Sequence, residues 1–165
     1  MKIAIRLVIV IVMAMAGTWL WSVLFPTPQH VIRARLNEFA RDASFTSSQS
    51  TLAGYLSAQT VGQFFSTNVE VTLNLPGNPE FIVSGRDQIV QSMIQAHAAV
   101  SELEVDFPDL NVTLAPDQNT ATADLTIRAQ IDGERNSLAE EMKFTLQKIG
   151  GQWLITHIES VQVLT

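Results

Sequence analysis

The end of the chain, Glu140–Leu164, constrains the fold more than any other stretch. Apolar side chains alternate with polar ones in its first part: Met142, Phe144 and Leu146. This period of two predicts a β-strand with one apolar face. Gly150-Gly151 then predicts a tight turn, and Trp153 opens a second, more apolar strand. Two long strands that end a chain need earlier strands and helices to cover them.

Composition and charge exclude several kinds of site. The chain has 165 residues, enough for one domain and an anchor, and no cysteine, which excludes disulfides and cysteine metal sites. Its net charge is −6. Without Lys2 and Arg6, 8 basic residues remain against 16 acidic ones, a net charge of −8. Such a domain would repel phosphate backbones, so no nucleic-acid partner is expected.

A membrane anchor is predicted at Leu7–Phe25, which holds 19 residues without a charge. As a helix it would span roughly 28 Å, close to the thickness of the hydrocarbon layer of a bilayer. Lys2 and Arg6 precede it, which favours a cytoplasmic N-terminus. The expected location is therefore the cell inner membrane, with a single pass and a periplasmic or other extracytoplasmic C-terminal domain.

A cleaved signal peptide is the alternative interpretation of this segment. Ala14-Met15-Ala16 resembles a cleavage site, but cleavage there would expose a new, strongly apolar N-terminus. The uncleaved anchor is therefore favoured. The expected organisation is residues 1–25 as stub and membrane helix, 26–29 as linker, and 30–165 as the folded domain.

The sequence pattern predicts a domain of helices and two short strands, followed by long strands. The first half is expected to contain a helix at His30–Ala43, a polar loop at Ser44–Ser50, and short helices at Thr51–Gln59 and Thr60–Ser66. A strand at Val69–Leu75, a turn at Pro76–Pro79, a strand at Phe81–Val83 and a helix from Ser84 to Val100 follow before the long strands. Apolar alternation then predicts strands at Leu103–Leu114 and Ala121–Ile131. The alternation reverses at Pro108-Asp109, which predicts a β-bulge there.

Three stretches in this order resemble the nuclear transport factor 2-like superfamily, in particular its SnoaL-like branch. They are Phe64–Val71, Val83–Ile89 and Phe144–Ile158. The resemblance covers roughly residues 30–164. It implies an α+β fold: a cone-shaped, strongly bent mixed β-sheet wrapped around three to four helices, with a cavity, here preceded by one transmembrane helix.

The resemblance also offers a test for enzyme chemistry. Steroid-isomerase-like members carry a general-base aspartate, a tyrosine and a protonated aspartate. The matching positions here are Leu73, Phe39 and the vicinity of Met142, with Glu141 adjacent. The base and the tyrosine are replaced by apolar residues, so these two positions lack the groups that the isomerase reaction needs. Cyclase-like and dehydratase-like members use other positions, which this test does not cover.

Candidate site residues follow from the same pattern. The expected ligand-binding cavity is lined by Phe39, Tyr55, Phe64, Phe65, Met93, His97 and Trp153. Candidates for acid–base chemistry are His97, His157 and Tyr55, with His157 sharing the alternation of Trp153 and Ile155. The simpler interpretation, favoured here, makes them core or rim residues. Three scattered histidines give no metal-ligand spacing, and no cofactor is expected.

Two functions remain open at this stage. The first is a membrane-anchored, non-catalytic ligand-binding or assembly domain with an apolar cavity, on the exported side of the membrane. The alternative is a SnoaL-like isomerase, cyclase or dehydratase acting on a hydrophobic small molecule. Expected partners are the lipid bilayer through the N-terminal helix, a hydrophobic small molecule, and a second copy of the chain through the outer face of the sheet. Fold alone does not separate these functions.

Overall fold

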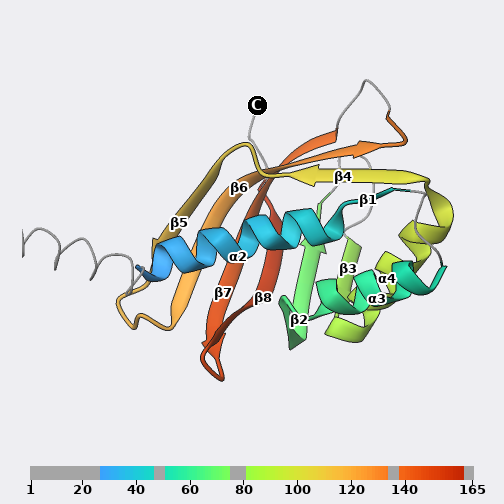
Figure 1. Cartoon of the computed structure of the whole chain (residues 1–165). Helices are drawn as coiled ribbons and strands as arrows, with labels where there is room; N and C mark the ends of the chain where they lie inside the picture. Colours follow the sequence, from blue (N-terminus) through green and yellow to red (C-terminus); the bar gives the residue numbers. More distant parts are fainter. Residues whose placement is uncertain (1–26, 47–50, 75–80, 134–137, 162–165) are drawn as a thin grey trace, which may run out of the picture.

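The computed structural model describes residues 27–46, 51–74, 81–133 and 138–161, which form one curved mixed sheet and three helices (Figure 1). This is the α+β architecture that the sequence predicts. The helices are α2 (Pro28–Ala43), α3 (Thr51–Gly62) and α4 (Arg86–Ala99). The predicted membrane segment and the Pro76–Pro79 turn lie outside the described residues.

The strands pair in the order β1-β4-β6-β7-β8-β2-β3, and β5 also pairs with β6. The strands are β1 (Phe45–Thr46), β2 (Phe65–Leu73), β3 (Phe81–Ser84), β4 (Glu102–Asp106), β5 (Leu110–Leu114), β6 (Thr120–Ile131), β7 (Leu138–Ile149) and β8 (Gln152–Ser160). Of the pairings in the described residues, β2 with β8 is parallel and the others are antiparallel. The mixed sheet curves around α2, which crosses it diagonally (Figure 1).

Helix α2 is amphipathic, as its sequence predicts. Its buried residues recur every three or four positions: Ile32, Leu36, Ala40 and Ala43. This spacing places them on one face, against the sheet. The helix begins at Pro28, earlier than expected, because proline suits the first turn, where its missing N–H would have no partner.

The prediction of two short helices between Thr51 and Ser66 is wrong. A single helix, α3, ends at Gly62, and β2 already begins at Phe65. A Cβ atom on Gly62 would lie 2.7 Å from Val90 Cγ2, so α3 and α4 approach closely at this glycine. Phe64 and Phe65 therefore belong to a turn and a strand instead of a helical stripe.

The predicted β-bulge at Pro108-Asp109 is confirmed by the pairing of β4 and β5 with β6. Asp106 opposes Arg128 and Leu110 opposes Leu125, so four steps along one strand match three along the other. The Asp109 carboxylate accepts hydrogen bonds from the Thr126 backbone N–H at 2.6 Å and from the Thr126 hydroxyl at 3.1 Å. These bonds lower the pKa of Asp109. The extra residue keeps the apolar side chains of β4 and β5 on the same face.

Because its pKa is lowered in the folded chain, Asp109 favours folding while it is ionised. Its contribution is complete above the ordinary carboxyl pKa of about 4 and is lost as the pH falls through the lowered pKa. We expect Asp109→Asn to lower the melting temperature at neutral pH and to weaken the loss of stability below about pH 4. Thermal unfolding at a series of pH values measures both effects. The same pH dependence in both proteins would show that the bulge does not need the charge.

Strand β7 follows the predicted alternation, and the large ring at the start of β8 is buried as expected. Met142, Phe144 and Leu146 are buried on β7, and Trp153 is buried at the start of β8. We expect Trp153→Ala to lower the free energy of unfolding by ~3–5 kcal/mol, because a large buried ring leaves a cavity when it is removed. Chemical denaturation of the full chain measures the change. An unaltered midpoint would mean that the ring contributes nothing to the core.

Candidate functional site

Five phenylalanines occupy the space between α2 and the sheet. The Phe39 ring on α2 lies 5.6 Å from the Phe64 ring and 5.5 Å from the Phe65 ring, centroid to centroid. It also lies 6.1 Å from Phe107 and 6.4 Å from Phe144. These separations are typical of favourable aromatic contacts. The structure thus brings three predicted cavity residues, Phe39, Phe64 and Phe65, together inside the curve of the sheet.

Arg35 fixes α2 beside this cluster. Its Nε–H donates to the Trp153 carbonyl at 2.7 Å, and its Nη2 donates to the Gln63 carbonyl at 3.0 Å. The guanidinium carbon lies 4.8 Å from the centre of the Phe64 ring, a cation–π distance. Sequence reasoning missed this role, since an arginine on an amphipathic helix usually faces water. One signal was available: Arg35 is one turn from Ile32 and Phe39 on the apolar side of α2.

Partly buried apolar side chains, two of the five phenylalanines among them, pack against the buried core, and we call them the margin of the interior. These residues come from α2, α4, several strands and the link between β4 and β5: Phe39, Val71, Leu73, Ile89, Met93, Val105, Phe107, Leu110, Leu114 and Ile127. Met93, another predicted cavity residue, belongs to the margin from α4. The interior can therefore offer a ligand apolar contacts and aromatic faces.

Tyr55 does not reach this interior. Its side chain lies on α3 with 48% of the residue exposed, and its hydroxyl accepts a hydrogen bond from Gln59 one turn later. The predictions that Tyr55 lines the cavity and that it serves as an acid–base candidate therefore do not fit its position. Helical spacing places Tyr55 with Leu52 and Leu56, but it does not say which side of α3 faces the core.

His97 is packed on α4, away from the aromatic cluster. Its Nδ1 lies 2.8 Å from the Met93 carbonyl oxygen, so Nδ1 carries the proton of this hydrogen bond. The ring stacks on Phe45, with centroids 3.7 Å apart and planes inclined by 18°. A Cβ atom on Gly54 would lie 3.2 Å from the imidazole Cδ2, so the ring fills the space beside that glycine. Within the described residues the buried Nε2 has no hydrogen-bond partner.

His157 lies on the opposite face of the sheet, which contradicts the predicted alternation. Thr145 opposes His157 whereas Leu146 opposes Ile155, so β8 has one extra residue, Thr156. This bulge reverses the direction of the side chains that follow. His157 consequently shares the outer face with Glu70 and Glu159. Its Nδ1 lies 3.9 Å from Glu70 Oε1, and its Nε2 lies 3.7 Å from Glu159 Oε2.

The three candidate acid–base side chains therefore share no site. His97 is packed between α3, α4 and β1, Tyr55 is exposed on α3, and His157 is on the outer face of the sheet. The positions compared with the isomerase-like enzymes belong to the apolar interior: Met142 is buried, and Phe39 and Leu73 pack against the core. Glu141 is exposed and opposes Thr126 on the neighbouring strand.

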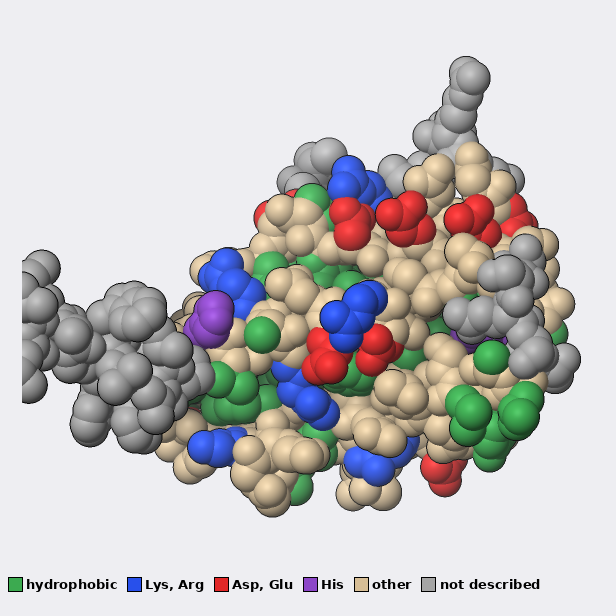
Figure 2. Space-filling model, viewed as in Figure 1, with side chains coloured by type: hydrophobic (Ala, Val, Ile, Leu, Met, Phe, Trp, Pro, Cys, Tyr) green, Lys and Arg blue, Asp and Glu red, His purple; other side chains and the backbone are tan. Residues whose placement is uncertain are grey.

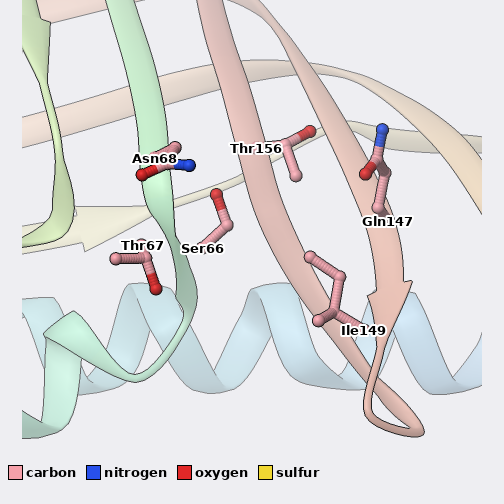
Figure 3. A pocket seen from close by; sticks show the side chains of 6 residues that line it. All are labelled: Ser66, Thr67, Asn68, Gln147, Ile149 and Thr156. Carbon is pink, nitrogen blue, oxygen red and sulfur yellow. The ribbon is translucent and has the colours of Figure 1, made fainter.

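An open hollow of about 350 Å³ lies where β2, β7 and β8 meet (Figure 3). Its lining is uncharged: Ser66, Thr67, Asn68, Gln147, Ile149 and Thr156. Gln147 and Ile149 alternate with the buried Leu146 on β7, so they face away from the core. The hollow coincides with the two irregularities of the sheet, between Phe65 and Glu70 on β2 and at Thr156 on β8. Sequence reasoning missed it, because neither irregularity interrupts the run of strand-forming residues.

Two further features of the described residues bear on the site. They contain no group of three or more His, Asp or Glu side chains placed to hold a metal ion. Among them, no helix combines the length and the hydropathy that crossing a membrane requires. The predicted anchor, Leu7–Phe25, precedes these residues and stays a prediction.

Comparisons with known proteins identify the fold. No family model and no curated protein matches the chain. An NTF2-like protein of unknown function from Pseudomonas putida superposes with a TM-score of 0.63 at 10% identity, over 83% of this chain and 87% of that one. Yeast UBP3-associated protein BRE5 gives 0.60 at 15% identity, over 84% and 100%. A proposed scytalone dehydratase from Novosphingobium aromaticivorans gives 0.57 at 13% identity, over 82% and 83%.

At these identities the similarity concerns the fold alone, and proteins of this shape include a proposed enzyme and a protein described by its association with another. Element order, the curved mixed sheet and these superpositions agree with the expectation drawn from the three sequence stretches. The chain has the nuclear transport factor 2-like fold.

Proposed function

We propose that this chain is a membrane-anchored, non-catalytic binding domain that holds a hydrophobic small molecule against the apolar interior of its curved sheet. One observation carries the proposal: His97, His157 and Tyr55 lie in three separate environments. Acid–base catalysis requires groups within hydrogen-bond reach of one reacting molecule, and these three do not converge on any. An apolar interior without such groups suits retention of a ligand better than its conversion.

The chemistry of the margin supports a hydrophobic ligand. Phe39, Leu73 and Met93 come from a helix, a strand and a second helix, and all are partly buried against the hydrophobic core. Ligand sites are lined mainly by apolar and aromatic side chains with few polar groups. The flexible thioether of Met93 adapts readily to the shape of a guest.

The membrane part of the proposal rests on the sequence before α2. Leu7–Phe25 is long and apolar enough to span a bilayer, and the basic residues before it favour an extracytoplasmic domain at the inner membrane. Because α2 already begins at Pro28, only Pro26-Thr27 would separate the span from the domain. Pairing with a second copy through the outer face of the sheet is also part of the proposal. On that face Arg128 pairs with Asp106 and Lys143 with Glu159, which offsets charge there.

The alternative is a SnoaL-like enzyme acting on a hydrophobic molecule. A proposed dehydratase and a proposed aromatic ring hydroxylase are among the structural neighbours, and those descriptions concern those proteins. In this chain the alternative requires an acid–base pair at the interior. No observation on the described side chains favours it.

Leu73→Phe tests the proposed binding position. Leu73 is partly buried at the margin, so a larger side chain there would occupy space that a ligand uses. We expect less hydrophobic material to co-purify with the detergent-extracted full chain, at an unchanged or higher melting temperature. Mass spectrometry of the extracted molecules, normalised to the amount of protein, measures the change.

Ile82→Phe is the matched control, because Ile82 lies on the neighbouring strand β3 and is 54% exposed. This variant should retain its bound material. Equal amounts from both variants and the original chain would contradict binding at the interior. Equal losses from both variants would show that added bulk on β2 and β3 acts indirectly.

A further inference from the structure

Helix α3 presents an apolar stripe to its surroundings. Leu52, Tyr55 and Leu56 are 68%, 48% and 56% exposed, and we call these three residues the α3 stripe. Their spacing of three and four residues places them on one side of the helix. In Figure 2 hydrophobic side chains gather over α3, at the lower right. Scattered exposed apolar residues are ordinary, but a continuous group of large ones indicates a surface that contacts something else.

Charge sets this surface apart from the rest of an acidic chain. From Ser44 to Val69 the sequence contains no Asp, Glu, Lys, Arg or His, a run of 26 residues that includes all of α3. Several acidic side chains line the upper edge of Figure 2 over β4, where Glu102 and Glu104 are exposed, and one acidic side chain lies beside the hydrophobic group at the lower right. A surface without charge can approach an apolar layer without the cost of removing ions from water.

The position of the α3 stripe relative to the chain before α2 indicates what the stripe contacts. Leu7–Phe25, the predicted span, ends just before α2 begins at Pro28. The 16 residues of α2 extend about 24 Å from that point. Helix α3 packs along α2, and two hydrogen bonds tie α2 to it and to the residue that follows it. Ser57 Oγ of α3 donates to the Asp42 carbonyl at 3.2 Å, and Arg35 of α2 donates to the carbonyl of Gln63, just after α3, at 3.0 Å.

The side of the domain that carries α2 and α3 also has the balance of charge that a lipid surface tolerates. Helix α2 holds Arg33, Arg35 and Arg41 against Glu38 and Asp42, a net charge of +1 in a chain of −6. Arg41 lies 3.6 Å from Glu38 and 3.4 Å from Asp42, so both acids have a basic neighbour. The acidic strand β4 lies away from the stripe (Figure 2).

We propose that the α3 stripe rests on a lipid surface, the same bilayer that Leu7–Phe25 enters, so that α2 lies along the membrane and the domain is held at both ends. The inference depends on the membrane anchor of the proposed function and adds a second contact to it. Leucine and tyrosine suit this position, because aliphatic carbons enter the acyl boundary while a phenolic hydroxyl stays among the headgroups. The domain would then present the margin of its interior at a fixed height above the lipid.

The absence of cysteine makes a direct test possible, since a single introduced cysteine is labelled without background. The full chain carrying Leu56→Cys is labelled with an environment-sensitive fluorophore and reconstituted into phosphatidylcholine vesicles that contain a shallow nitroxide-lipid quencher. We expect a blue shift of the emission and strong quenching. Leu52→Cys serves as a second probe of the stripe, with the same expectation.

Leu138→Cys is the matched control, because Leu138 is 66% exposed, about as much as Leu52, but lies at the start of β7. Its label should show neither the shift nor the quenching. Quenching of all three labels, or of none, overturns the proposal. A blue shift at Leu56 that grows with protein concentration without quenching by lipid also overturns it, and would indicate a second copy of the chain as the occupant.

Flotation of the vesicles separates this inference from the anchor on which it depends. A chain that does not float with the vesicles contradicts the proposed anchor. Vesicles are then added to that chain in excess: quenching at Leu56 but not at Leu138 supports lipid contact by the stripe alone, and no quenching overturns it. A chain that floats without quenching at Leu56 keeps the anchor and removes the second contact.

Discussion

The packing of α2 across the curved sheet is the constraint on which the rest of the structure depends. Phe39 meets four other phenylalanine rings there, and Arg35 binds the carbonyls of Gln63 and Trp153. These contacts join α2 to the turn before β2 and to the start of β8, two strands that pair in parallel. Because aromatic rings and a carbonyl-bound guanidinium have directional contacts, they fix the angle of the helix as well as its burial. The concave interior and its apolar margin follow from that angle.

Local periodicity was enough to predict most of the sheet. Alternation gave β6 and β7, and its reversal at Pro108-Asp109 gave the bulge that the register confirms. The bulge at Thr156 could not be predicted in this way, because Trp153, Leu154 and Ile155 are all buried and no reversal marks it. That single extra residue moved His157 from the expected interior to the outer face. Where no proline or glycine marks a sheet irregularity, its position depends on how the strand pairs with its neighbours. The sequence of the strand itself therefore does not predict it.

The sequence also predicted the burial of some candidate-site residues correctly and that of others wrongly. Phe39, Phe64, Phe65 and Trp153 were predicted as interior residues and are packed there, since large apolar side chains have few alternatives to burial. Tyr55 was predicted with them and is exposed, because α3 is apolar on more than one side and its orientation is set by α2 and α4. The uncharged hollow beside β2 and the exposed stripe of α3 both depend on packing between distant segments. Neither feature could therefore be predicted from the local pattern of the sequence.

Retention of a hydrophobic molecule without chemical change is the central claim of this account, and identification of the molecules that co-purify with the chain tests it most directly. The measurement compares, by mass spectrometry, the molecules that co-purify with the original chain and with a variant carrying both His97→Gln and His157→Gln. We expect the same molecules in the same proportions, because neither histidine faces the aromatic cluster between α2 and the sheet. A different molecule in the variant, related to the original one by the gain or loss of water or by another single reaction, would mean that a substrate accumulates when the histidines are absent, and would contradict the account.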